Sequence, residues 1–157
     1  MRCTRPILLV AAAGVLFALV GAVAPAQAAE QVPFTITEQI NFATGEATFT
    51  ATGPLCPSGT FVDTVATVGG GRSGQPKIEL LITSVYTCDD GSGTFDAIKH
   101  VFITFNPDGS FTNAGPVQIL GGTGAYAGLI GHGVDTGATS GDIGVGQITG
   151  WVIQSGG

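Results

Sequence analysis

Positive charge is scarce in this chain. Its 157 residues include five lysines and arginines against eleven aspartates and glutamates, which gives a formal net charge of −6. A protein that binds the phosphates of nucleic acids or an anionic membrane surface needs the opposite balance, so the sequence argues against both partners. Charged residues of either sign make up only 10% of the chain and hydrophobic residues 44%. This composition also excludes an intrinsically disordered protein.

Long apolar runs are absent except at the N-terminus. Arg2 and Arg5 precede an uncharged apolar stretch over residues 7–23, and Ala26-Gln27-Ala28 follows it. This order is typical of a secretory signal peptide that is cleaved after Ala28, so we expect residues 1–28 to be removed and the protein to be secreted. The alternative is a retained membrane anchor, but the run is shorter than the ~20 residues that span a bilayer comfortably.

Cysteine is also rare. Residues 29–157 have the length of one domain and contain only Cys56 and Cys88. A cysteine pair in an exported chain predicts a disulfide, which would close a loop of roughly 33 residues and stabilise the fold by roughly 3–4 kcal/mol. The alternative is a metal site, but that needs further Cys or His ligands at short spacing, which the sequence lacks. We therefore expect a disulfide and no metal.

Alternation of apolar and polar side chains dominates the rest of the chain, and no segment has a helical period. The alternating segments are separated by turns rich in Gly, Pro, Asn and Asp, which is typical of β-hairpins. The predicted strands are Phe34–Phe42, Glu46–Thr52, Thr60–Val68, Lys77–Cys88, Thr94–Phe105, Phe111–Leu120, His132–Thr136 and Val145–Gln154. About eight strands with few charges favour an all-β fold, a single antiparallel closed barrel, because closure removes exposed edges. A β-sandwich is the alternative.

One glycine-rich segment carries a resemblance to known proteins. It reads Leu120-Gly121-Gly122-Thr123-Gly124-Ala125-Tyr126-Ala127-Gly128-Leu129-Ile130-Gly131-His132-Gly133. This segment resembles the one found before the penultimate strand of the allene oxide cyclase-like and dirigent-like barrels. The match covers about 14 residues, and the remaining chain agrees only in length, strand count and order. Streptavidin-like or lipocalin-like barrels of the calycin type are the alternative.

The resemblance implies an eight-stranded barrel with a largely apolar cavity. In the cyclases such a barrel encloses a fatty-acid-derived epoxide, and in dirigent proteins it guides a coupling reaction. Neither group needs a metal or an organic cofactor. Barrels of both families often pair into dimers or trimers, so the resemblance is also compatible with a homo-oligomer. The cyclases use a carboxylate on the first strand to stabilise a developing cation, and Glu38 is the residue here that matches it. No counterpart of the rest of either family's catalytic set is found, which leaves activity open.

Glu38 also stands out on physical grounds. Alternation places it on the same face as Phe34, Ile36 and Ile40, where an unpaired charge would cost several kcal/mol. A carboxylate inside an apolar cavity has the properties of an acid, a base or a cation stabiliser. The alternatives are a bulge that turns Glu38 outward, or an ion pair with a cation such as Lys99 or Arg72.

Other polar residues within predicted strands have weaker signals. His100 shares a face with Ile98 and Phe102 and is a second catalytic candidate, although a lone histidine there also fits a structural hydrogen bond. Asp63 and two other strand carboxylates, Glu79 and Asp96, fit a solvated face equally well.

Three large aromatic residues, Tyr86, Tyr126 and Trp151, are candidates to line a ligand pocket. Each offers apolar area and one polar group, although core packing explains them as well; Tyr126 is also expected to plug the barrel end. Two functions remain. The first is a secreted barrel that binds a small apolar molecule and isomerises or cyclises it without a cofactor. The second is a non-catalytic exported module with a structural or protein-binding role.

Overall fold

A computed structural model describes residues 30–70 and 77–154 of the chain. The predicted signal peptide at residues 1–28 lies outside the described residues. The described part contains eight strands and one short 3-10 helix, η1. Their bounds are β1 (Val32–Asn41), β2 (Glu46–Thr52), β3 (Ser58–Gly70), β4 (Lys77–Cys88), β5 (Thr94–Phe105), β6 (Phe111–Gly122), η1 (Gly124–Tyr126), β7 (Leu129–Ser140) and β8 (Ile143–Gln154).

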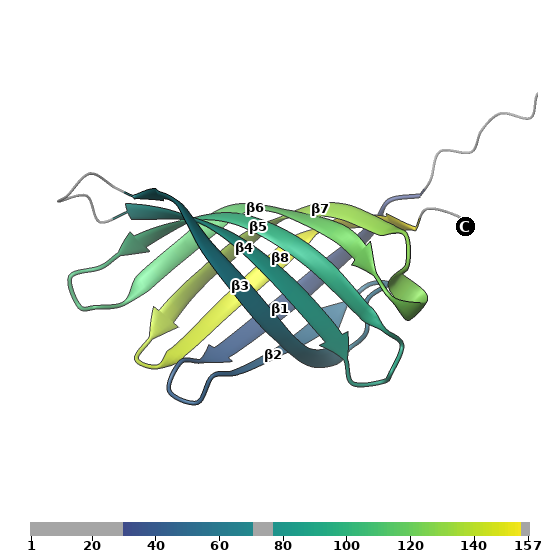
Figure 1. Cartoon of the computed structure of the whole chain (residues 1–157), viewed down its shortest axis with the longest axis horizontal. Coiled ribbons are helices and arrows are strands. Elements are labelled where there is room, and N and C mark those ends of the chain that lie inside the picture. Colours follow the sequence, from purple (N-terminus) through teal and green to yellow (C-terminus); the bar gives the residue numbers. More distant parts are fainter. Residues whose placement is uncertain (1–29, 71–76, 155–157) are drawn as a thin grey trace, which may run out of the picture.

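The strands form a closed antiparallel barrel in chain order (Figure 1). Each strand pairs with the next one along the chain, and β1 pairs with β8 over ten residue pairs from Val32–Val152 to Asn41–Ile143. The prediction of an all-β closed barrel is therefore confirmed, and the alternative, a β-sandwich, is wrong. Within the described residues, no helix has the length and apolar character needed to cross a membrane.

The bounds of β2, β4 and β5 agree with the sequence prediction, but β7 is longer than predicted. The prediction covered only His132–Thr136, whereas the strand runs from Leu129 to Ser140. The inward face of this strand is rich in glycine, which hides the usual apolar alternation. At Gly131 a Cβ would lie 2.4 Å from the carbonyl oxygen of Trp151, so glycine permits the close approach of β8.

One half of the barrel is filled by a hydrophobic core, and we call the end at this half, which carries η1 and the β4–β5 turn, the core end. Tyr86 stacks on Phe95 with ring centroids 4.6 Å apart, and Phe49 meets both rings edge to face. Tyr126 from η1 is buried and packs against Phe95 at 5.5 Å. The glycine-rich segment before β7 thus brings an aromatic side chain to this end, where its hydroxyl meets Ser92 at 3.1 Å.

The predicted disulfide is present. Cys56 and Cys88 are bonded, with Cα atoms 5.9 Å apart, and both side chains belong to the core. Cys56 lies just before β3 and Cys88 is the last residue of β4. The bond therefore fixes the β2–β3 connection to the end of β4, at the core end of the barrel.

Candidate functional site

The other half of the barrel contains a cavity. The turns β1–β2, β5–β6 and β7–β8 lie at this end, which we call the cavity end (Figure 1). The cavity has a volume of about 190 Å³. Most of its lining is apolar, and the residues that contribute are Glu38, Ile40, Phe42, Asp63, Val65, Leu80, Ile82, Lys99, Val101, Ile103, Phe111, Asn113, Asp135, Ala138, Thr139, Gly144, Val145 and Gly146.

Glu38 lies on the inner face of β1, as the alternation predicted, and is 5% exposed. Its two carboxylate oxygens accept hydrogen bonds from Nζ of Lys99 at 2.9 and 3.1 Å. The hydroxyl of Tyr86 donates a further hydrogen bond to Oε1. Glu38 is therefore neither turned outward nor unpaired, and Lys99 is its partner. Arg72, the other cation considered for it, lies outside the described residues.

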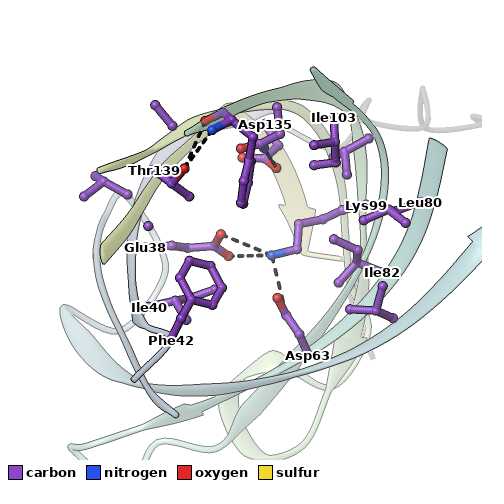
Figure 2. A pocket seen from close by; sticks show the side chains of 18 residues that line it. Glu38, Ile40, Phe42, Asp63, Leu80, Ile82, Lys99, Ile103, Asp135 and Thr139 are labelled. Atoms are coloured by element: carbon purple, nitrogen blue, oxygen red, sulfur yellow. Dashed lines mark hydrogen bonds and ion pairs between the residues drawn. The ribbon is translucent and has the colours of Figure 1, made fainter. Parts of the chain in front are cut away.

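Lys99 reaches the centre of the barrel from the inner face of β5 (Figure 2). It is 2% exposed, and its Nζ also lies 3.6 Å from Oδ1 of Asp63. The ring centroids of Phe61 and Tyr86 lie 5.3 and 5.9 Å from the same nitrogen. Burial by itself lowers the pKa of the ammonium, but the nearby carboxylates, Glu38 first, outweigh it, so the pKa of Lys99 is raised.

Two further residues, Ser84 and Tyr86, form hydrogen bonds with the carboxylates around Lys99. Ser84 on β4 donates a hydrogen bond of 2.6 Å to Oδ1 of Asp63, so this carboxylate bridges Ser84 and Lys99. Burial, and then the charge of Glu38, raise the pKa of the Tyr86 hydroxyl well above its ordinary value. The Tyr86 hydroxyl therefore keeps its proton at physiological pH and donates it in the hydrogen bond to Glu38.

Asp135 on β7 is the third carboxylate of the cavity and is 3% exposed. Its Oδ2 accepts a hydrogen bond of 2.7 Å from the side-chain amide of Asn113. Its Oδ1 is buried and has no hydrogen-bond partner among the described residues. Burial first, and the charge of Glu38 second, raise the pKa of Asp135 from 3.8 to about 7.

These residues form what we call the polar floor: Glu38, Asp63, Lys99 and Asp135. It holds three carboxyl groups and one ammonium group, so it is negative whenever at least two of the carboxyl groups are ionised. The surrounding walls are apolar and weaken the screening by water. Such a floor attracts a positive charge, or a group that develops one, and repels an anion.

The structure separates the residues predicted from sequence into three places. Glu38 and Tyr86 come together beside the cavity, whereas Tyr126 lies in the core at the opposite end. His100 does share a face with Ile98 and Phe102, but this is the outer face, where its ring contacts the carboxylate of Glu79.

Trp151 is also on the outer face, with its ring centroid 5.4 Å from that of His132. The structure therefore places neither His100 nor Trp151 at the cavity. Both remain candidates from sequence alone, on a surface remote from the polar floor.

Sequence reasoning missed three residues of the polar floor. Lys99 appeared only as a structural partner of Glu38, and Asp63 fitted a solvated face, although its side chain points inward and is 18% exposed. Asp135 was not considered, although it lies within the predicted strand His132–Thr136, and the apolar residue beside it, Val134, faces outward. Val134 is 52% exposed. The sequence offered only a weak signal here, because Asp135 shares its face of β7 with glycines, Gly133 and Gly137, rather than with apolar side chains.

In the part of the chain that the structure describes, no group of three or more His, Cys, Asp or Glu side chains is arranged to hold a metal ion. Two carboxylates of the polar floor, those of Glu38 and Asp63, form ion pairs with Lys99. No family model, curated protein or solved structure matches this chain.

Proposed function

We propose that this protein binds a small, largely apolar molecule in the cavity and does so outside the cell. The observation that carries the proposal is a cavity of about 190 Å³ with apolar walls and a buried, charged floor. An apolar hollow with a few convergent polar groups is the usual form of a small-molecule site. The Cys56–Cys88 bond supports export, because such bonds persist in oxidising compartments.

The volume limits the size of the ligand. An apolar cavity of about 150 Å³ is enough to hold benzene, whereas sites for drug-sized molecules measure roughly 300–1,000 Å³. The cavity therefore fits one ring-sized group or the end of a longer molecule. Phe42 and Val145 line its rim and are 52% and 49% exposed, which provides an apolar entrance.

The proposed function agrees with the resemblance of the glycine-rich segment to allene oxide cyclase-like and dirigent-like barrels. Those families also use a closed eight-stranded barrel, and the cyclases have a first-strand carboxylate inside it. Here the closed barrel and the inward position of Glu38 on β1 support the same arrangement. We therefore propose that this chain is a member of that group of barrels, with no metal or organic cofactor.

One observation favours a second candidate, a cofactor-independent isomerase or cyclase. Asp135, whose pKa is raised to about 7, stands near Glu38, so one carboxyl group has the proton affinity of an acid–base catalyst. Its test is incubation with an unsaturated, fatty-acid-derived epoxide, with product analysis by chiral chromatography. Conversion that disappears in Glu38→Gln supports catalysis, whereas decay at the rate of the protein-free control rejects it for this substrate class.

Binding itself is tested by methyl NMR with benzyl alcohol as the probe. We expect saturable shifts of the cavity methyl groups of Ile40 and Ile103, and loss of these shifts in Ile82→Trp, which fills the cavity. Leu81→Trp is the matched control, because Leu81 is the neighbouring residue on the outer face of β4. His100→Ala is expected to bind like the wild type. Equal losses in both tryptophan variants would contradict the proposal, as would the absence of saturable shifts both with this probe and with its charged analogue, benzylamine.

A further inference from the structure

We infer that the ligand carries a positively charged amine, which binds Oδ1 of Asp135 at the polar floor while its apolar body contacts the cavity walls. This inference rests on the proposed binding function and adds the chemical class of the ligand. Four observations support it: the engagement of Lys99, the unpartnered oxygen of Asp135, the space above Gly146, and the excess of carboxyl groups.

Lys99 is already engaged by carboxylates of the protein itself. Its ammonium group donates hydrogen bonds to both oxygens of Glu38 at 2.9 and 3.1 Å, and it forms an ion pair with Oδ1 of Asp63 at 3.6 Å. An anionic ligand would have to displace these contacts. The one cation of the floor is therefore committed to the protein's own carboxylates.

Asp135, in contrast to Lys99, has an oxygen that is free to accept a hydrogen bond from a ligand. Asn113 donates to its Oδ2, but Oδ1 is buried and lacks a partner among the described residues. A buried carboxylate oxygen without a donor is costly, and the side chain lines the cavity. A ligand that donates a hydrogen bond to this oxygen removes the cost, and a charged donor makes the strongest such bond.

The space needed for the amine is provided by glycine. Gly146 on β8 pairs with Glu38 across the sheet. A Cβ built on Gly146 would lie 3.2 Å from Oε2 of Glu38 and 3.6 Å from Oδ1 of Asp135. No side chain fills this position, so a group placed over Gly146 is within reach of two carboxylates at once.

The excess of carboxyl groups in the polar floor favours a cationic ligand. Three carboxyl groups share one ammonium group, and the raised pKa of Asp135, caused by burial and then by Glu38, is consistent with the lack of a second cation. No metal-holding group of side chains is present among the described residues. An organic ammonium ion with an apolar body fits both the charge of the floor and the character of the walls.

The test compares benzylamine with benzyl alcohol, which have the same ring but differ in charge at neutral pH. Methyl NMR titrations of the wild-type protein are expected to give a Kd for the amine that is lower by about tenfold or more, because a charged donor strengthens the hydrogen bond. In Asp135→Asn, which keeps the shape of the side chain, the two affinities should come within about twofold of each other.

Two further measurements decide the outcome if Asp135→Asn does not fold. Gly146→Ala leaves every charge in place and should weaken the amine more than the alcohol. In the wild type, the preference for the amine should be larger above pH 7 than below it, since Asp135 is then ionised. The titratable side chains that face Asp135 are Glu38 on β1, Asp63 on β3 and Lys99 on β5.

The outcomes separate the inference from the function on which it rests. If the alcohol binds the cavity as tightly as the amine, the inferred ligand class is wrong and the binding function stands. If neither probe shifts the cavity methyl groups, both are refuted. An amine preference that is unchanged in Asp135→Asn, or in Gly146→Ala, would overturn the assigned position.

Discussion

Replacement of Lys99 by methionine is the sharpest perturbation of this barrel. Methionine has a similar length and fills the same space, but it removes the one cation of the polar floor. Glu38 and Asp135, both buried, then lose their opposite charge. Breaking a buried pair in this way costs about 3–5 kcal/mol. Against a total stability of roughly 5–15 kcal/mol for a typical domain, this loss should be large.

The assay is equilibrium unfolding in urea, followed by circular dichroism with the disulfide intact. We expect the midpoint to fall in Lys99→Met at neutral pH and the loss to shrink in acid, where protonated carboxyl groups no longer need a cation. Lys77→Met is the matched control, because Lys77 is exposed at the start of β4. It should change the free energy of unfolding by at most about 0.5 kcal/mol.

A double-mutant cycle identifies the cause. If the loss arises from the unpaired charge of Glu38, the variant Glu38→Gln/Lys99→Met should be more stable than the sum of the two single changes predicts. The coupling energy should exceed about 1 kcal/mol for a buried, hydrogen-bonded pair. A loss below about 1 kcal/mol in Lys99→Met, or additive effects in the cycle, would refute the reasoning.

Three further changes test separate parts of the structure. Cys56→Ala/Cys88→Ala should lower the free energy of unfolding by about 3–4 kcal/mol through lost loop closure; an unchanged urea midpoint would contradict this. Tyr86→Phe removes the hydrogen bond to Glu38 and should lower the free energy of unfolding in urea by about 1–3 kcal/mol. An unchanged free energy of unfolding would contradict this expectation. The pKa of Asp135 is raised from 3.8 in the unfolded chain to about 7, so the folded state binds this proton more tightly and stability should fall as pH rises between these values, by up to about 4 kcal/mol. Asp135→Asn should flatten that decline, and an unaltered pH profile in this variant would show that another group causes it.

The sequence by itself determined the strands and their order. The alternating runs, the turn residues between them and the scarcity of charge predicted a closed antiparallel barrel, and the bounds of β2, β4 and β5 follow the pattern residue for residue. The pairing of Cys56 with Cys88 followed from their number. The inward position of Glu38 followed from its neighbours, because Phe34 and Ile36 are apolar and the opposite face is polar. Local periodicity suffices where one face is clearly apolar.

Only the tertiary structure decided which residues surround Glu38. In β5 both faces mix apolar and polar side chains, so alternation could not tell whether Lys99 or its neighbour His100 points inward. In β7 glycine lines the interior, and the apolar Val134 faces out while Asp135 faces in. Strand pairing around the closed barrel fixes these orientations. Each strand pairs with a neighbour on both sides, and the register of these pairs decides which of its two faces points into the barrel. That closure brings Lys99 on β5 and the carboxyl groups of Glu38, Asp63 and Asp135, which come from three other strands, to one cavity.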